Sequence, residues 1–257
     1  MDKISVLIIA NATPVMGGTF NYTRSIIQLL SESDKFEVEV VSADVTIGGR
    51  SVSCSKLSIP QLISYILRQR SFDAVFCPTY FLPLFLFRGS KFVTIHDFQE
   101  RYLPENFSAM QRLWRRFTHF MTELANPTYL CESEYVKSDI TKFIGVPSSR
   151  IAVAKVPSLM SEFDKSLAAL GNTLRDLDVF YPAKFWKHKN HIIILKALAL
   201  LKSKGVVVNA TFTGGAKRSN GVMYSLVNEY QLSDQVTILG AVSFDEIIQL
   251  YRRAKLL

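Results

Sequence analysis

Three lysines and two histidines are concentrated in residues 180–191, whose sequence is Phe-Tyr-Pro-Ala-Lys-Phe-Trp-Lys-His-Lys-Asn-His. A short apolar run precedes this stretch, and residues 192–201 form a longer apolar segment after it. The pattern predicts a strand, a basic loop and a buried helix. The N-terminus of a helix carries unpaired N–H groups and about half a positive charge, so adjacent lysines would favour an anion. The stretch is a candidate phosphate site; the alternative is a solvated basic turn.

The distribution of charge supports a local anion site. The chain has 257 residues and a formal net charge of +8. Residues 1–170 hold 18 basic and 16 acidic side chains, whereas residues 171–257 hold 12 and 6, so most of the excess lies in the last third. Zinc-ligand spacing, interleaved aromatics and other nucleic-acid patterns are absent from the sequence. We therefore expect a small phosphorylated ligand and no nucleic-acid partner.

The composition indicates a globular protein without a membrane span. Hydrophobic residues make up 48% of the chain and charged residues 20%, which is enough for one large or two small cores. The longest apolar runs are far shorter than the roughly 20 residues of a spanning helix. Three widely separated cysteines, Cys54, Cys77 and Cys131, show no metal-ligand spacing. A cytoplasmic protein with reduced thiols and no metal site is expected.

Strands and helices are predicted to alternate along the whole chain. The strands expected in the first part are 4–10, 36–41, 73–77, 92–95, 128–131 and 151–156, and the helices are 20–30, 60–70, 108–124 and 133–145. The second part is expected to hold strands 178–182, 206–212 and 236–239 and helices 190–204, 219–230 and 243–254. This alternation predicts an α/β protein with two doubly wound, Rossmann-like parallel sheets in tandem.

The predicted domains are an N-terminal Rossmann-like domain over residues 1–170 and a second, nucleotide-binding domain over residues 171–257. A fourth apolar strand of the second domain is expected to start at 255–257, where the sequence stops. The second domain is therefore expected to be incomplete, as in a fragment or a truncated protein.

Two further features lie where such sheets bind ligands. Gly17 and Gly18 follow the first predicted strand, and a glycine pair lets backbone N–H groups approach a phosphate or a sugar without a Cβ in the way. A plain tight turn is the alternative. His96 lies at the end of a predicted buried strand, from which its imidazole can bind a sugar hydroxyl or a developing charge. A packing or capping histidine beside Asp97 is the alternative.

A second glycine pair, at 214–215, is followed by Lys217 and Arg218. This arrangement is typical of a phosphate contact but also of an ordinary turn between a strand and a helix, and the turn is favoured. Residues 110–121 form a basic, aromatic-rich helix whose arginines and aromatic side chains segregate partly by face. Contact with anionic lipid head groups is one interpretation, and an ordinary amphipathic surface helix is the other.

The order of these features resembles family-4 glycosyltransferases, a large bacterial group of retaining enzymes with the GT-B fold. The blocks that carry the resemblance are the glycine pair 17–18 before Tyr22, residues 94–97, residues 133–140 followed by 145–147 and Ile151, residues 181–191, and residues 236–240 followed by Glu246 and 250–254. These blocks span nearly the whole chain.

The resemblance implies an enzyme that moves a hexosyl group, with retention, from a nucleotide-diphospho-sugar to a glycan or lipid-linked acceptor. It implies a role in bacterial polysaccharide or cell-surface glycan synthesis at the inner face of the plasma membrane, with no metal and no cofactor. Gly17 and Gly18 would face the donor phosphates and the acceptor. His96 would contact the donor sugar near the reacting carbon, and Asp97 would shape that loop. Lys189 would neutralise the donor diphosphate.

The chain departs from the family pattern at two places. The arginine that normally accompanies the lysine falls at Ala183, so Lys184 is the candidate substitute, although a lysine cannot form a bidentate clamp. The family also carries a Glu-x7-Glu element beyond the last helix, which this chain does not reach. One alternative is therefore a truncated, catalytically impaired binding protein. Another is a dinucleotide enzyme, which would need a G-x-G-x-x-G motif where only adjacent glycines occur.

Overall fold

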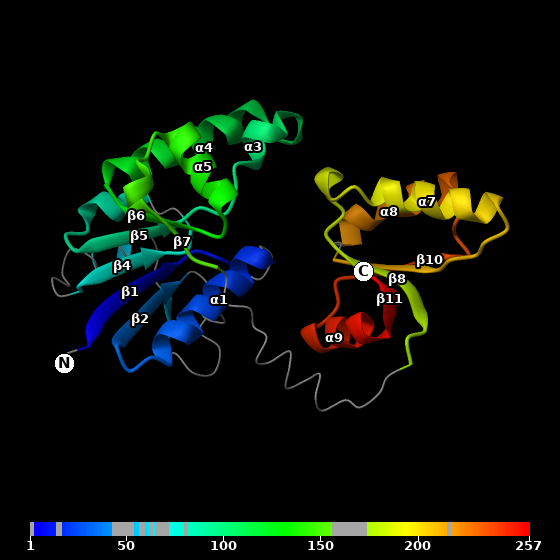
Figure 1. The fold of residues 1–257 in the computed structure, drawn as a ribbon, viewed down its shortest axis with the longest axis horizontal. Helices are drawn as coiled ribbons and strands as arrows, with labels where there is room; N and C mark the ends of the chain where they lie inside the picture. Colours follow the sequence, from blue (N-terminus) through cyan, green and yellow to red (C-terminus); the bar gives the residue numbers. More distant parts are fainter. Residues whose placement is uncertain are drawn as a thin grey trace. The chain divides into compact units, whose positions relative to one another are not determined.

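The computed structural model describes residues 3–13, 17–42, 54–56, 60–61, 64, 72–79, 82–155, 174–214 and 217–257. The chain forms two compact units, Met1–Met160 and Ser161–Leu257, which are treated separately below (Figure 1). The point of division and the predicted boundary at 170/171 both fall within residues 156–173, which lie outside the described residues. The domain boundary therefore stays a prediction.

Unit 1 is built on a seven-stranded sheet in which all paired strands are parallel. Its strands are β1 Ile4–Ala10, β2 Phe36–Ser42, β3 Cys54–Lys56, β4 Ala74–Cys77, β5 Ser90–Thr94, β6 Thr128–Cys131 and β7 Ile151–Val153. They lie in the order β3-β2-β1-β4-β5-β6-β7. The chain first builds outward from β1 through β2 and β3, then returns to pair β4 with the other side of β1. The direction of winding thus reverses between β1 and β4, as the doubly wound prediction requires.

Helices cover both faces of this sheet. They are α1 Gly18–Ser31, η3 Leu82–Leu86, α3 Gln99–Tyr102, η4 Pro104–Asn106, α4 Ala109–Leu124, α5 Glu134–Ile144 and η5 Ser148–Arg150. Figure 1 shows α1 on one face and α4 with α5 on the other. Val6 and Ile8 of β1 pack in the cluster under α1, whereas Leu7 and Ile9 pack with η3 on the opposite face. Burial on both faces explains why β1 reads as a continuous apolar run.

Local capping signals set the bounds of two helices. Ser108 and Gln111 form a capping box at the start of α4. Ser133 accepts a hydrogen bond from the N–H of Val136 at the start of α5, and Gly145 ends that helix in the left-handed conformation, with φ of 85°. Capping residues of this kind mark the ends of helices.

Unit 2 repeats the same winding on a smaller scale. Its elements are β8 Leu177–Pro182, η6 Lys187–Lys189, α7 His191–Ser203, β9 Ala210–Thr213, α8 Lys217–Glu229, β10 Val236–Gly240, α9 Phe244–Arg253 and β11 Ala254–Leu256. The four parallel strands lie in the order β10-β9-β8-β11, so the winding reverses between β8 and β11. The predicted fourth strand at the end of the chain is confirmed by the pairing of β11 with β8.

Two predicted strands need correction. The apolar run 206–212 gives a strand only from Ala210, because the N–H of Val206 donates to Leu201 O and closes the end of α7. The predicted strand 151–156 is assigned only as far as Val153. The short edge strand β3 was not predicted, and the predicted helix 60–70 lies largely outside the described residues.

Cys77 and Cys131 are buried free thiols, and burial raises the pKa of the Cys77 thiol. None of the described helices is both long and apolar enough to cross a bilayer.

Stability of unit 1 is expected to depend on pH through His119 of α4. This ring packs 5.2 Å from Phe98, and burial, assisted by Arg115 and Arg101, lowers its pKa from 6.5 to about 4. The imidazole of His119 therefore takes up a proton near pH 6.5 in the unfolded chain but only near pH 4 in the folded chain. The folded state consequently loses stability as the pH falls from about 6.5 toward about 4. Between about pH 7 and about pH 5 the loss should be about 2 kcal/mol.

Urea unfolding of the wild type and of His119→Gln at both pH values measures this contribution. The variant should lose less stability on acidification than the wild type, by about the same 2 kcal/mol. An identical loss in the two proteins would mean that His119 is protonated in the folded chain as readily as in the unfolded chain.

Candidate functional site

His96 lies at the edge of the unit 1 sheet where the carboxyl ends of its strands meet. It follows β5 by two residues, while Pro78 directly follows β4 and Glu132 directly follows β6. The His96 Nδ1 atom is 2.9 Å from Glu132 Oε1, and its Nε2 atom is 3.0 Å from the carbonyl oxygen of Pro78. Three adjacent strands thus bring their ends together around one imidazole ring.

The two partners of His96 are both acceptors. The carbonyl oxygen of Pro78 can only accept, so Nε2 donates in that bond when it carries the ring proton, and Nδ1 faces the Glu132 carboxylate. Both hydrogen bonds together fix the orientation of the ring. The His96 side chain is 22% exposed, so a ligand can reach it from solvent. A sugar hydroxyl that takes the Nε2–H must displace the Pro78 carbonyl.

Tyr22 connects this histidine with helix α1. Its ring stands edge-on to the His96 ring, with centroids 4.9 Å apart, and its hydroxyl lies 3.0 Å from Thr94 Oγ1 in a buried contact. Burial is the main cause that raises the pKa of the Tyr22 phenol, so the hydroxyl stays protonated. Tyr22 is on the second turn of α1, and it therefore holds the N-terminal end of that helix beside His96.

Gly17 and Gly18 form the start of α1, two residues earlier than predicted. Gly17 has φ of 61° and ψ of −108°, a conformation that a residue with a Cβ strongly disfavours. Among the described residues no side chain caps the start of α1 at Gly17, so the first N–H groups of the helix are candidate donors to a ligand. A Cβ on Gly18 would meet nothing within 4 Å in the described structure, so packing alone does not require glycine there.

Asp97 faces the helices that follow it. Its Oδ1 atom accepts from the N–H of Gln99 at 3.3 Å and lies 3.6 Å from Arg115 Nη1. The same Arg115 nitrogen donates to the buried Glu100 at 2.9 Å. These contacts tie the loop after His96 to α3 and α4, which is consistent with a role for Asp97 in shaping that loop.

The basic loop of unit 2 follows β8, at the point where the strand order reverses. Two backbone hydrogen bonds fold it tightly: Trp186 N–H donates to Lys184 O at 2.7 Å, and Lys189 N–H donates to Trp186 O at 2.9 Å. The Lys184 ammonium lies 4.7 Å from the centre of the Trp186 ring. The Lys189 side chain is exposed, while its carbonyl oxygen accepts from the Tyr181 hydroxyl at 2.9 Å. These contacts hold the loop backbone in place and leave the Lys189 side chain exposed.

His191, the first residue of α7, packs against the side chains of this loop. It is buried and meets Tyr181, Phe185 and Phe212 in edge-to-face contacts of 4.9, 4.9 and 5.4 Å. Burial lowers its pKa, an effect opposed by a hydrogen bond to the backbone of Ala183, and its Nε2 atom has no described hydrogen-bond partner. A neutral, buried ring therefore anchors the loop.

Gly214 follows β9 and lies close to the backbone of the same loop. It has φ of 98°, and its N–H donates to Gly240 O at 2.7 Å. A Cβ at this position would lie 3.0 Å from the carbonyl carbon of Ala183 and 3.2 Å from the backbone nitrogen of Lys184. The structure thus gives Gly214 a packing role in the turn. Gly215 and the side chain of Lys217 lie outside the described residues.

Glu132 was missed by the sequence prediction, and Tyr22 and His191, which lie in the predicted blocks, were given no role at the site. Glu132 is 36 positions from its partner His96, and only the pairing of β5 with β6 brings them together. The sequence shows that His191 stands at the start of an apolar helix, but it does not show that the side chain is buried.

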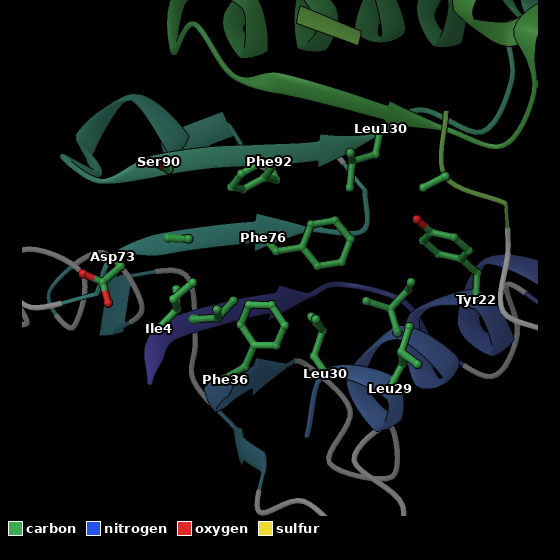
Figure 2. A pocket seen from close by; sticks show the side chains of 14 residues that line it. Ile4, Tyr22, Leu29, Leu30, Phe36, Asp73, Phe76, Ser90, Phe92 and Leu130 are labelled. Atoms are coloured by element: carbon green, nitrogen blue, oxygen red, sulfur yellow. The ribbon is translucent and has the colours of Figure 1, made fainter. Parts of the chain in front are cut away.

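An apolar groove of about 600 Å³ lies between α1 and the sheet of unit 1 (Figure 2). Of the residues that line the groove, Tyr22 alone belongs to the sequence blocks that carry the family resemblance. Apolar side chains such as Phe36, Phe76 and Phe92 dominate the rest of the lining. The Asp73 carboxylate at its rim accepts hydrogen bonds from the backbone N–H and the hydroxyl of Ser5. This groove lacks the cationic groups that a nucleotide diphosphate requires. Within the described part of the chain, no cluster of His, Cys, Asp and Glu could hold a metal ion.

Substitution of Gly214 tests how tightly the end of β9 is fitted to the basic loop. Gly214→Ala should destabilise the protein by about 1–3 kcal/mol, because the added Cβ meets the Ala183 backbone and because the positive φ is strained. Gly221→Ala is the matched control: this glycine lies within α8 with open space around it, so alanine should stabilise by about 0.5–1 kcal/mol. Urea unfolding of both variants measures the contrast, and equal effects would contradict it.

Comparison with known proteins found a family that matches unit 2 and solved structures that share the fold. Residues 162–257 match the family model described as "Glycosyl transferases group 1". A curated relative, the O-antigen chain mannosyltransferase RfbU of Salmonella typhimurium, is 27% identical over 165 residues, which cover 63% of this chain and 43% of the relative. The match thus spans less than half the length of that curated relative.

Solved structures share the arrangement of almost the whole chain. HepE from Anabaena, solved in complex with UDP and glucose, superposes with a TM-score of 0.67 at 16% identity, over 98% of this chain and 73% of its own. A glycosyltransferase from Rickettsia africae gives a TM-score of 0.63 at 14% identity, over 99% and 72%. These similarities confirm the predicted α/β fold: the chain has the GT-B glycosyltransferase fold, and its residues 162–257 match the group 1 glycosyl transferases.

Proposed function

We propose that this protein is a glycosyltransferase that moves a hexosyl group from a nucleotide-diphospho-sugar to a glycan or lipid-linked acceptor. The proposal includes membership of family 4, retention of configuration, and independence from metal ions and cofactors. It also includes a place in bacterial cell-surface polysaccharide synthesis, with the protein in the cytoplasm and at the inner face of the membrane.

The observation that carries the proposal is the basic loop at the start of α7. It lies after β8, where the sheet of unit 2 reverses its winding, and within the stretch that matches the group 1 glycosyl transferases. Parallel sheets of this kind bind ligands at such a reversal. The uncapped N-terminus of α7 and the lysines beside it supply donors and positive charge for a diphosphate. HepE was solved with UDP and glucose bound, and a nucleotide of that class would suit this loop.

The chemistry assigned to the loop is stabilisation of the leaving nucleotide diphosphate. Negative charge develops on the diphosphate as the glycosidic bond breaks, and prepositioned cations lower the energy of that state. We assign this role to Lys189 and Lys184. Lys184 provides a point charge rather than the bidentate fork of an arginine, and its position over the Trp186 ring sets the direction from which it approaches a phosphate.

In unit 1, His96 is assigned to recognition of a sugar hydroxyl or of the charge that develops near the reacting carbon. Its Nε2–H is the group that a ligand would receive in exchange for the Pro78 carbonyl. Glu132 is a positioning residue, because it holds the opposite ring nitrogen. The first N–H groups of α1, at Gly17 and Gly18, are assigned to the same ligand.

Nucleotide binding tests the role of the loop. Calorimetry with UDP, GDP and their sugars on the full chain should show saturable binding, and Lys189→Ala should weaken it roughly tenfold, the effect of losing one charge-assisted hydrogen bond. Lys196→Ala, which removes an exposed lysine farther along α7, is the matched control and should bind like the wild type. An unchanged affinity in Lys189→Ala removes that residue from the site. No binding by the wild type would refute the donor assignment.

Turnover tests the role of His96. With the donor sugar that binds in calorimetry, His96→Ala should reduce nucleotide release by about a hundredfold or more while leaving the melting temperature close to that of the wild type. Glu132→Ala should lower kcat more than it raises KM, and Glu132→Gln, which keeps an acceptor for Nδ1–H, should restore most of the loss. Glu134→Ala, an exposed neighbour at the start of α5, is the control.

Two results would change this assignment. Parallel loss of activity and of melting temperature in His96→Ala would mean that the histidine only packs the sheet edge. Donor binding without any turnover in the wild type would favour the alternative, a glycosyltransferase-like binding protein.

A further inference from the structure

Two tyrosines lie close together at the carboxyl edge of the unit 1 sheet. Tyr102 is the last residue of α3 and comes six positions after His96. Tyr135 is the second residue of α5 and comes three positions after Glu132. The strands that lead into these two helices, β5 and β6, are neighbours in the sheet. The two tyrosines therefore lie at the same edge as the candidate site around His96.

The rings of Tyr102 and Tyr135 form an exposed surface, called the tyrosine platform below. Tyr102 is 45% exposed and Tyr135 is 65% exposed. Their ring centroids lie 6.1 Å apart, and the ring planes are inclined by 37°. A tyrosine combines an apolar ring face with a hydroxyl group at its end, which is why this residue type is frequent on binding surfaces.

A buried carboxylate holds the platform in place. Asp139 lies one turn after Tyr135 on α5 and is only 4% exposed. Its Oδ1 atom accepts a hydrogen bond from the Tyr102 hydroxyl at 2.5 Å, and this bond is the main cause that raises the pKa of the Tyr102 phenol. A carboxylate has about four lone-pair sites on its two oxygens, so Asp139 can accept further hydrogen bonds beside that of Tyr102.

A lysine lies on the same side of α5. Tyr135, Asp139 and Lys142 follow one another at intervals of four and three residues, which places them on one face of the helix. The Lys142 ammonium is 5.9 Å from the centre of the Tyr102 ring and 4.9 Å from that of Phe143. Hydrogen-bond donors of Lys142 and acceptors of Asp139 thus flank the tyrosine platform.

We propose that the tyrosine platform binds a hexose ring of the glycan acceptor. The apolar C–H face of the sugar would pack on the Tyr135 ring, and its hydroxyls would bond to Lys142 and to the Asp139 carboxylate. The inference rests on the proposed glycosyltransferase function. It specifies that unit 1 recognises the sugar of the acceptor rather than a lipid chain.

The polar groups of the cluster favour a neutral ligand rich in hydroxyls. The Asp139 carboxylate would repel a phosphate group, whether from a nucleotide or from a lipid. An apolar chain laid on the platform would cover Asp139 and Lys142 without giving either a hydrogen-bond partner, which is costly. A hexose hydroxyl both donates and accepts, so one sugar ring can satisfy the carboxylate and the ammonium together.

Saturation-transfer NMR on the full chain tests the proposal. The probes are the methyl α-glycosides of mannose, glucose and galactose, and at least one should receive saturation from the wild type, most strongly at the C–H protons of one ring face. Tyr135→Ala should weaken the affinity for that glycoside at least about fivefold, whereas Tyr135→Phe, which keeps the ring, should retain most of it. Both variants should melt close to the wild type, because Tyr135 is largely exposed.

The matched control is Tyr224→Ala on α8 of unit 2, where the tyrosine is 51% exposed. This variant should bind the glycoside like the wild type. Asp139→Asn keeps an oxygen acceptor for the Tyr102 hydroxyl but removes the charge. It should weaken glycoside binding roughly fivefold, because a neutral amide accepts a hydroxyl proton less strongly than a carboxylate does.

Calorimetry with UDP on the same variants separates this inference from the proposed function. Tyr135→Ala should bind UDP like the wild type. A wild type that binds UDP but none of the three glycosides would overturn the platform and leave the proposed function standing. A wild type that binds a glycoside through Tyr135 but does not bind UDP would refute the donor assignment and support the platform. An equal loss of glycoside binding in Tyr135→Ala and Tyr224→Ala would also overturn the platform.

Discussion

Parallel strand pairing is the constraint on which the rest of the molecule depends. Consecutive parallel strands require a crossover that returns the chain to the same edge of the sheet, so all carboxyl ends lie along one edge. Where the order of strands reverses, at β1 and β4 and again at β8 and β11, the crossovers lead away on both sides and leave that edge uncovered. The start of α1, the His96 loop and the basic loop all follow strands at such edges.

Two histidines at these edges differ in burial: one packs against a loop and the other can be reached by a ligand. His191 is enclosed by aromatic rings, its pKa is lowered by burial, and a neutral ring of this kind holds the loop above it. His96 is partly exposed, and each ring nitrogen lies within 3.0 Å of an oxygen atom, so the ring is oriented but can exchange the Pro78 carbonyl for a ligand. The residue type is the same, and the difference in surroundings decides which of the two rings a ligand can reach.

Local signals made most of the fold predictable from the sequence. The bounds of α5 follow from Ser133 and Gly145, and β1 follows from its apolar run. Contacts between distant residues were not predictable in this way. Glu132 meets His96 only because β5 and β6 are neighbours in register, and the strand expected from residue 206 starts at Ala210 because the chain first closes α7. The roles predicted for Lys184 and Lys189 remain predictions, because their positions alone do not demonstrate a ligand.

Helix α4 shows most clearly what a sequence pattern leaves open. A period of three to four residues defines an apolar stripe, but the same period is compatible with either face against the core. Burying the polar face is tolerated here because the Thr118 and Thr122 hydroxyls donate to the carbonyl oxygens of Arg115 and Thr118 within the helix. Their polar groups are therefore satisfied without water, and the usual cost of burying a hydroxyl is avoided. This local satisfaction leaves the apolar face free to interact with something other than the protein's own core.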